Sequence, residues 1–374
     1  MQNNVTEMNL TENKTKQRNA SMDLLRILAM LFIVGLHLIQ SNIGLKRIES
    51  EIIPAHEYVS LSFFNNLFMI GVNLFFLISG FFRINFRLSK ILSLLFKVYF
   101  YWLISQLIAF AVGIYSPDSV TDFFITFIGA ISKYWFVIVY ILLCIMSPLL
   151  NSFAQSLSKS GVKYFMFVSI TFFVAGGFVA DIFYPYFGTG EGFLPLWAWV
   201  VYLYGRFISL YRNDIKLKTR YLYFIWAIAT LLNFAVIQII YFVSGNGKLV
   251  FHFFAYNNPL IVISSVSLFI PFVRMNLSLS RNGISMVAGH TLAVYLLHSN
   301  NLLISPYRGA LIAVAKPFWA RFLLLFPNML CLFVLGIAVD VVYELLIGKY
   351  IIKLFEKIEN SIKKLIKIEK KPSD

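Results

Sequence analysis

The chain has 374 residues, of which 59% are hydrophobic and only 13% are charged. Soluble globular proteins carry about 25% charged residues, so this composition excludes two or three soluble domains and, by its hydrophobicity, a disordered chain. The net charge of +15 could suggest nucleic-acid binding in a soluble protein, but in a membrane protein it reflects Lys and Arg retained on the cytoplasmic side. We therefore expect a polytopic, all-α integral membrane protein that binds no nucleic acid.

Apolar segments long enough to cross a membrane follow one another along most of the chain. A spanning helix needs about 20 apolar residues. The segment 120–133 could instead form a re-entrant or interfacial piece, and residues 18–346 are expected to form one transmembrane domain. The sequence predicts about ten spanning helices, at 21–40, 60–82, 91–115, 134–150, 164–183, 194–211, 221–244, 257–273, 284–304 and 319–345.

Both ends of the chain differ from this transmembrane part. Residues 1–17 are polar and lack apolar periodicity, which predicts a disordered cytoplasmic arm. Residues 347–374 place apolar side chains at helical spacing with lysines on the other face, which predicts a basic amphipathic helix on the anionic inner leaflet. Most of the 32 basic residues lie in the two ends and in the loops that alternate to the same side. We therefore expect both termini to be cytoplasmic.

The two cysteines, Cys144 and Cys331, each lie within an apolar segment. Neither has a histidine or a second cysteine at the spacing of a metal site, so small buried side chains are the simpler interpretation. We expect no disulfide framework, no metal ion and no permanently bound cofactor.

The first predicted span carries three ionisable residues, which are costly inside a bilayer. Asp23 and Arg26 are three positions apart and can pair on one helix face. Eleven positions separate Arg26 from His37, and a helix makes about three full turns over that length, so both project to one side, about 16 Å apart along the axis. An interfacial ion pair and a packing histidine are one interpretation. The other is a site in which His37 transfers a proton, since imidazole titrates near neutral pH.

Four stretches in order give the chain a resemblance to a known family. Arg26-x10-His37, preceded by Asp23, is similar to the first-helix signature of the membrane-bound acyltransferase-3 family, the bacterial polysaccharide O-acyltransferases. The other three stretches also resemble the family, and together the four match in order and spacing from about residue 18 to 345. They are Gly71-Val-Asn73 through Ser79-Gly80 with basic residues after it, Tyr134-Trp135-Phe136 through Tyr140, and Val294-Tyr295-Leu-Leu-His298.

The resemblance implies an acyltransferase of about ten helices in the bacterial cytoplasmic membrane. Such an enzyme takes an acyl group from cytoplasmic acyl-coenzyme A and places it on a hydroxyl of a cell-surface polysaccharide or its lipid-linked precursor. We expect acetyl, with succinyl as the alternative. The resemblance assigns function to His37, as general base or acyl carrier, and to Arg26, with Asp23 beside it.

Basic residues after the second predicted span are candidates for binding the phosphates of coenzyme A. Some family members carry Arg-x-x-Arg here, whereas this chain has Arg83-x-x-x-Arg87, one residue longer, followed by Lys90. Guanidinium and ammonium groups pair well with phosphate. Ordinary retention of positive charge on the inner side would equally explain any one of the three.

Five further residues are candidates for a substrate site or a second catalytic site. His298 lies at a depth in the ninth span similar to that of the histidine in the first span, so the two could pair, although His298 could also be a packing residue. Tyr295, Trp135, Tyr140 and Asn73 belong to the same family-like stretches. We expect His290, two turns away, to be structural.

Acidic residues near the inner end of the last span suggest charge balance. Asp340 and Glu344 are four positions apart and share a face, so they could neutralise Arg26 or Lys97. We favour this interpretation over a catalytic role for the two carboxylates.

Two other functions would also place charged residues inside a bundle. A transporter or flippase of lipid-linked sugars needs them around a midplane cavity, and a polysaccharide polymerase would need no coenzyme A. Against the transporter, the sequence has no internal repeat and no pair of matching broken helices. Binding of acetyl-coenzyme A would separate the acyltransferase from both.

Overall fold

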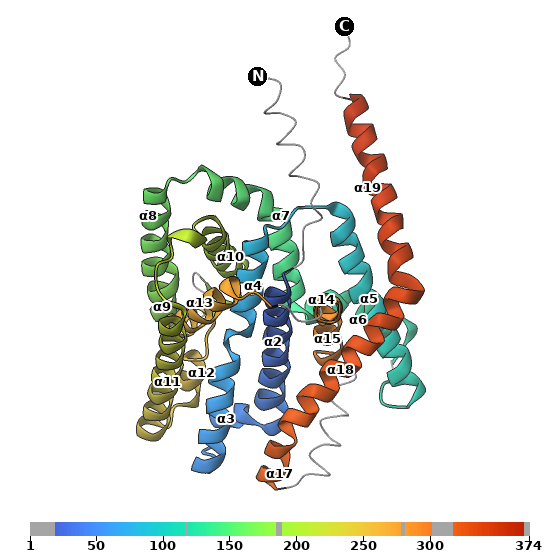
Figure 1. Cartoon of the computed structure of the whole chain (residues 1–374). Coiled ribbons are helices and arrows are strands. Elements are labelled where there is room, and N and C mark those ends of the chain that lie inside the picture. The colour runs from blue at the N-terminus through green and yellow to red at the C-terminus, as the bar shows by residue number, and fades with distance from the viewer. Residues whose placement is uncertain (1–18, 117, 185–188, 278–280, 301–316, 370–374) are drawn as a thin grey trace, which may run out of the picture.

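The computed structural model describes residues 19–116, 118–184, 189–277, 281–300 and 317–369. Within these ranges the chain is almost entirely helical and forms no β-strand (Figure 1). The predicted arm at 1–17, the predicted end of the ninth span beyond residue 300 and the last five residues of the tail lie outside the described residues.

Helices follow one another with short connections. Three π-helical segments continue or join them, Leu38–Ile43 after α2, Ile170–Gly176 between α8 and α9, and Glu344–Gly348 between α18 and α19. The α-helices are α2 Ala20–His37, α3 Ala55–Phe68, α4 Ile70–Phe82, α5 Leu88–Ala111, α6 Val120–Ile128, α7 Trp135–Ser156, α8 Lys159–Ser169, α9 Gly177–Phe183, α10 Pro195–Leu210, α11 Thr219–Ser244, α12 Gly247–His252, α13 Pro259–Arg274, α14 Arg281–Gly289, α15 Thr291–His298, α17 Phe318–Leu323, α18 Leu325–Tyr343 and α19 Lys349–Glu369.

Seven helical segments among the described residues are long and apolar enough to cross a membrane, judged by length and composition. They match seven of the predicted spans. The other three predicted spans correspond to shorter helices, namely α10, α13, and α14 with α15. The prediction of a helical, multi-pass membrane protein is therefore confirmed, whereas ten spans and cytoplasmic termini stay predictions.

Helix α2 lies at the centre of the bundle, where it contacts α3, α4, α13, α14, α15 and α18 (Figure 1). Its apolar side chains are buried on several sides, and Leu25, Ala29 and Val34 have no exposed surface. A helix that is apolar all round is expected in the core of a large bundle. The ionisable residues of α2 are therefore held among other helices.

Glycines let α4 and α10 touch through their backbones. A side chain at Gly80 would collide with the Tyr202 carbonyl of α10, and one at Gly205 would collide with the Leu77 carbonyl of α4. Small residues at helix crossings allow such close approach in membrane proteins. The pair holds the end of α4, and the basic segment that follows it, in a fixed place.

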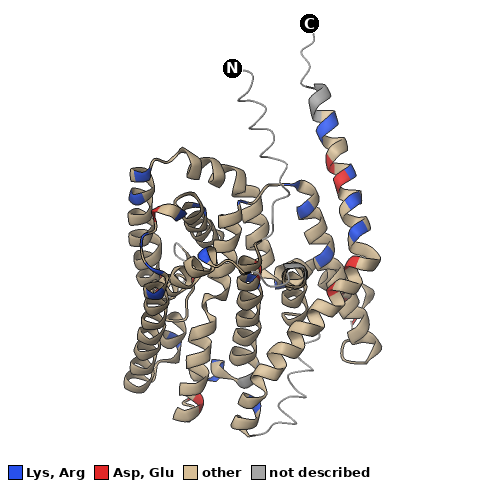
Figure 2. Cartoon of the chain, viewed as in Figure 1, with Lys and Arg blue, Asp and Glu red and all other residues tan. Residues whose placement is uncertain are grey.

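Charged residues are distributed unevenly along the bundle. Figure 2 shows most Lys and Arg at the end from which α19 projects, and few at the opposite end, near α17. We call these the basic end and the α17 end. Because Lys and Arg are retained on the cytoplasmic side, this distribution supports the predicted orientation.

Helix α19 packs along α5 and contacts the first turn of α5 (Figure 1). The Glu359 carboxylate of α19, which is buried, accepts a hydrogen bond of 3.0 Å from the backbone N–H of Ser89. This satisfies one of the N–H groups that a helix start leaves unpaired. The predicted basic tail is thus a helix anchored on α5, and its contact with the inner leaflet remains a prediction.

Candidate active site

Two histidines from distant parts of the chain meet in the bundle. His37 ends α2 and His298 ends α15, and His37 Nδ1 lies 2.9 Å from His298 Nε2. The ring centroids are 5.0 Å apart, and His298 is only 5% exposed. The sequence predicted similar depths for the two rings, and the structure brings them into a direct hydrogen bond.

The hydrogen bonds of this histidine pair define which nitrogens carry protons. His298 Nδ1 lies 2.5 Å from the Val294 carbonyl, which can only accept, so His298 Nδ1 donates. In the neutral ring His298 Nε2 then accepts a hydrogen bond from His37 Nδ1. His37 Nε2 is consequently the nitrogen that keeps a lone pair, as a general base requires.

Asp23 and Arg26 form the predicted ion pair. Arg26 Nη1 donates to Asp23 Oδ1 at 2.8 Å, and the Ser285 hydroxyl of α14 donates to Asp23 Oδ2 at 2.7 Å. Asp23 is buried, whereas a quarter of the Arg26 side chain is exposed. Asp23 therefore fixes the orientation of Arg26 and ties α2 to α14.

Arg26 lines a cavity of about 290 Å³, which we call the Arg26 cavity. Tyr140 of α7, Ser79 of α4 and Leu94 of α5 also line it. Ser79 lies one turn before Arg83, and Leu94 lies one turn after Lys90. The cavity therefore lies just inside the basic segment that joins α4 to α5.

The three candidate donor-binding residues are all exposed, Arg83 and Arg87 on this connecting segment and Lys90 in the first turn of α5. Arg83 adopts a left-handed backbone conformation with φ of 60°, which costs a non-glycine residue about 1–2 kcal/mol. Arg87 pairs with Glu356 of α19 at 3.5 Å, a partner that the sequence did not predict.

Two side chains hold the same segment against the bundle. The backbone N–H of Ile84 donates to the Tyr202 hydroxyl at 3.1 Å, and the Asn151 side chain donates to the Ile84 carbonyl at 3.0 Å. Tyr202 in turn donates to Asn151 at 2.8 Å. The basic segment is thus fixed at Ile84 by residues of α7 and α10.

The aromatic candidates Tyr295 and Trp135 both pack against Phe136 of α7. Tyr295 packs edge-on against Phe136 and lies 6.0 Å from the His298 ring, between centroids. Trp135 packs against Phe193 at 4.9 Å and against Tyr256 at 6.0 Å. The two candidates therefore belong to one continuous aromatic wall.

Asn73 supports this wall from behind. Its amide nitrogen donates to the Tyr256 carbonyl at 2.9 Å, and its oxygen accepts from the Trp197 indole at 3.0 Å. Both polar atoms of the buried side chain are used within the protein. The contacts of Asn73 are structural, and its predicted role toward a substrate gains no direct support from them.

A second polar cluster surrounds Asp340 of α18. Lys97 of α5 pairs with Asp340 at 2.7 Å and with Glu344 at 3.2 Å. The Tyr101 hydroxyl and His290 Nδ1 also donate to Asp340, at 2.7 and 2.8 Å. We call these five residues the Asp340 cluster.

The sequence anticipated only part of the Asp340 cluster. It predicted charge balance for Lys97 and a structural role for His290, but it did not identify Tyr101 or link His290 to Asp340. The available signal for Tyr101 was its place one turn after Lys97 on the same helix face.

No group of three or more His, Cys, Asp or Glu that could hold a metal ion occurs within the described residues. Cys144 is half-buried and Cys331 is exposed. The prediction that both cysteines are buried is therefore wrong for Cys331, because it lies on a face of α18 that the bundle leaves uncovered.

The fold and site together define a multi-pass helical membrane protein with a histidine pair and an arginine-lined cavity in its core. The chain matches the model of the acyltransferase domain family known as acyltransferase 3 over residues 19–340, and it belongs to that family. No curated protein and no solved structure matched the chain. The match confirms the family resemblance and assigns acyl transfer.

Proposed function

We propose that the protein transfers an acyl group, most simply acetyl, from cytoplasmic acyl-coenzyme A to a hydroxyl of a cell-surface polysaccharide or its lipid-linked precursor. The bacterial cytoplasmic membrane is its proposed location. The observation that carries the proposal is the His37–His298–Val294 chain of hydrogen bonds, which leaves His37 Nε2 as a base. A base is what a neutral hydroxyl needs before it can attack a thioester.

The proposed reaction balances without a further reagent. His37 Nε2 takes the proton of the acceptor hydroxyl as its oxygen attacks the thioester carbonyl. A carbon–oxygen bond forms, the carbon–sulfur bond breaks, and the departing coenzyme A thiolate takes the proton from His37. If His37 first carries the acyl group, a carbon–nitrogen bond to Nε2 forms as the carbon–sulfur bond breaks and the thiolate leaves. The acceptor oxygen then forms its bond to the acyl carbon as the carbon–nitrogen bond breaks, and the hydroxyl proton ends on the thiolate.

His298 acts in this scheme as a positioning residue. By accepting from His37 Nδ1, it fixes the tautomer and the ring orientation of His37. An aspartate performs the equivalent task for the histidine of serine proteases. Here the positioning group is neutral, because its own Nδ1 donates to a backbone carbonyl.

Distance separates the role of Arg26 from that of His37. The two residues lie on the regular helix α2, and eleven positions correspond to about 16 Å along its axis. An arginine side chain does not span that length, so Arg26 cannot hydrogen-bond the carbonyl that reacts beside His37. We therefore assign Arg26, with Tyr140, to holding the extended donor in the Arg26 cavity.

The phosphates of the donor would then lie at the basic end. Arg83, Arg87 and Lys90 are exposed about one turn outside the Arg26 cavity. The donor arm would pass between α4 and α5 into the cavity, with its phosphates on these three cations. This arrangement delivers the thioester toward the histidine pair from the basic end.

The proposal is tested in cells and with purified protein. Mass spectrometry of the host polysaccharide, with and without the protein, should show a loss of one acyl mass per repeat in its absence. Purified protein should bind acetyl-coenzyme A, and His37→Gln should retain that binding while losing transfer. An unchanged polysaccharide, together with no binding of acetyl- or succinyl-coenzyme A, would contradict the proposed function.

A further inference from the structure

A second cavity adjoins the histidine pair from the side. It has a volume of about 480 Å³, within the range of ligand sites, and its walls are α5 and α18 with the end of α15 between them. His298 is one of the residues that line it. We call this the lateral cavity.

The rim of the lateral cavity faces the surroundings of the bundle. Ile104 of α5 is 37% exposed, and Leu335 and Leu346, on and just after α18, are 57% and 66% exposed. In a protein that spans the membrane, exposed side chains of this kind contact lipid hydrocarbon. The cavity therefore leads sideways from the bilayer to His298.

The Asp340 cluster lies across the α5 side of the approach from the basic end. Lys97 joins α5 to α18 through Asp340 and Glu344, and the lining residues of α5 follow Lys97 in the direction of the α17 end, while the α18 side of the lining continues past Asp340 to Ile347. A donor chain arriving from the cytoplasm along α5 would meet these ion pairs before it reached the cavity. A molecule already in the bilayer does not cross them, because it enters past exposed Ile104 and Leu335.

Two hydroxyl groups in the lining are already hydrogen-bonded within the protein, so an occupant need not supply polar partners for them. The Tyr101 hydroxyl already donates to Asp340, and the Ser105 hydroxyl already donates to the Tyr101 carbonyl. The remaining walls are largely aliphatic and aromatic. A hydrocarbon chain therefore fits the cavity, because it leaves no buried polar group without a partner.

We propose that the lateral cavity receives the hydrocarbon chain of a lipid-linked acceptor, so that the acceptor reaches the histidine pair from within the bilayer. This inference rests on the proposed function. It selects the lipid-linked precursor over the finished polysaccharide as the substrate, since a free polysaccharide has no chain to place between α5 and α18.

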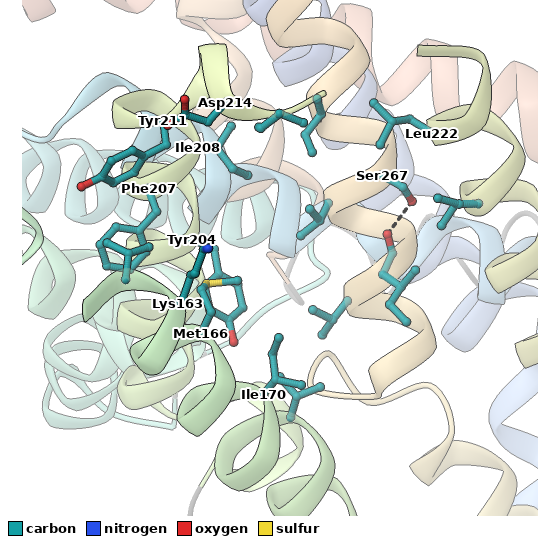
Figure 3. Close-up of a pocket in the computed structure, with 18 of the residues that line it drawn as sticks. Lys163, Met166, Ile170, Tyr204, Phe207, Ile208, Tyr211, Asp214, Leu222 and Ser267 are labelled. Carbon is teal, nitrogen blue, oxygen red and sulfur yellow. Dashed lines mark hydrogen bonds between the residues drawn. The ribbon is translucent and has the colours of Figure 1, made fainter. Parts of the chain in front are cut away.

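Another apolar cavity provides a matched control. It has a volume of about 590 Å³ and lies among α8, α10, α11 and α13. Figure 3 shows Tyr204 and Met166 on one side of it and Ser267 of α13 on the other. It shares no lining residue with the lateral cavity or the Arg26 cavity. Ile263 lies at its rim and is 44% exposed.

The first experiment compares two acceptors that differ only in the lipid. Full-length protein in vesicles receives labelled acetyl-coenzyme A with the host's lipid-linked oligosaccharides, or with the same glycans released by mild acid. We expect the lipid-linked form to be acetylated at least tenfold faster. Ile104→Trp should raise the KM for the lipid-linked acceptor at least tenfold and leave the KM for acetyl-coenzyme A unchanged. Ile263→Trp, the matched change, should alter neither.

Two results would overturn the inference. Equal rates with both glycans, and no effect of Ile104→Trp, would show that the cavity takes no part in acceptor binding. A preference for long-chain over acetyl donors, with the KM for the donor rather than the acceptor raised in Ile104→Trp, would make the cavity a site for the donor's acyl chain.

A crosslinking measurement tests whether the lateral cavity binds a hydrocarbon chain even if no transfer is detected. A polyprenyl phosphate with a photoreactive diazirine in its chain should label peptides of α5 and α18, and Ile104→Trp should remove most of the label. Labelling confined to α8 and α13 would contradict the inference. Absence of transfer to either glycan would count against the proposed function, whereas the labelled peptides still decide which cavity holds the chain.

Discussion

The histidine pair and the Asp340 cluster are both buried polar groups at opposite ends of α15, yet they differ in how their hydrogen bonds are used. Asp340 accepts from Lys97, Tyr101 and His290, so both of its carboxylate oxygens are used in hydrogen bonds. Within the described residues His37 bonds to no carboxylate, and its bond to His298 leaves Nε2 with a lone pair. Because the oxygens of Asp340 are all used in hydrogen bonds, we interpret the cluster as structural. Because His37 Nε2 keeps a lone pair, we interpret the histidine pair as reactive.

The largest effect on activity is expected at His37. His37→Gln keeps a polar side chain that can hydrogen-bond but cannot take a proton near neutral pH. Acyl transfer should fall by about 10²–10⁴-fold, with thermal stability and membrane yield unchanged, as measured by transfer assays and melting curves. Near-normal transfer by this variant would move catalysis away from His37 and make His298 the next candidate.

The largest effect on stability is expected at Asp340. Asp340→Leu leaves Lys97 with Glu344 alone and removes the partner of His290. Breaking a buried ion pair from one side typically costs about 3–5 kcal/mol, so yield and melting temperature should fall while activity per folded molecule persists.

The double variant Lys97→Met with Asp340→Leu sharpens this test. It removes both members of the buried pair and leaves the Glu344 carboxylate, whose side chain is 38% exposed, so part of the lost stability should return. If Asp340→Leu is stable but inactive, the assignment of the cluster to structure is wrong.

An intermediate effect is expected at His298. Gln in its place can still accept from His37 Nδ1, whereas Phe cannot. We expect His298→Gln to lose roughly tenfold in kcat, because one displaced hydrogen bond is worth about 1 kcal/mol, and His298→Phe to lose considerably more. The KM for acetyl-coenzyme A should stay constant in both. Equal losses in the two variants would show that His298 only fills space.

A smaller effect is expected on donor binding at the basic end. Arg83→Ala with Arg87→Ala should raise the KM for acyl-coenzyme A by about tenfold, corresponding to about 1.4 kcal/mol, and lower kcat less. Salt should reduce the difference, since exposed charges are screened within about 8–10 Å. An unchanged KM would place the coenzyme A phosphates elsewhere.

The smallest effect is expected from Glu356→Gln, which releases Arg87 from its partner on α19. Exposed ion pairs contribute about 0–1 kcal/mol, so the KM for the donor should fall less than about fivefold. Ser361→Ala on the same helix is the control. A raised KM in Glu356→Gln would mean that the pair positions Arg87 for the donor instead of competing with it.

Local patterns predicted the parts of the site that lie on one helix. The Asp23–Arg26 pair and the common face of Arg26 and His37 follow from helical spacing, which the sequence displays directly. The approximate positions of the helices follow from apolar segments in the same way, including short α10 and α13.

For residues on distant segments, the patterns predicted similar depths in the membrane but could not establish a contact. His37 and His298 are 261 positions apart, and Ser89 and Glu359 are 270 apart, so their meeting depends on how α15 and α19 pack. The sequence likewise marked Asn73 as a site candidate, because no pattern shows that Trp197 and Tyr256 use both of its polar atoms.

The backbone contact between α4 and α10 limits how this molecule can move. Gly80 and Gly205 bring the two main chains into direct contact. If one helix slid or tilted against the other, carbonyl oxygens would collide with Cα atoms. We therefore expect α4 and α10 to move together as one rigid unit. The proposed lipid-linked acceptor must nevertheless enter and leave the bundle. Movement must then occur where side chains alone connect the helices, as where Lys97 and Tyr101 of α5 contact Asp340 of α18. We therefore expect α5 and α18, rather than α4 and α10, to separate as the acceptor enters.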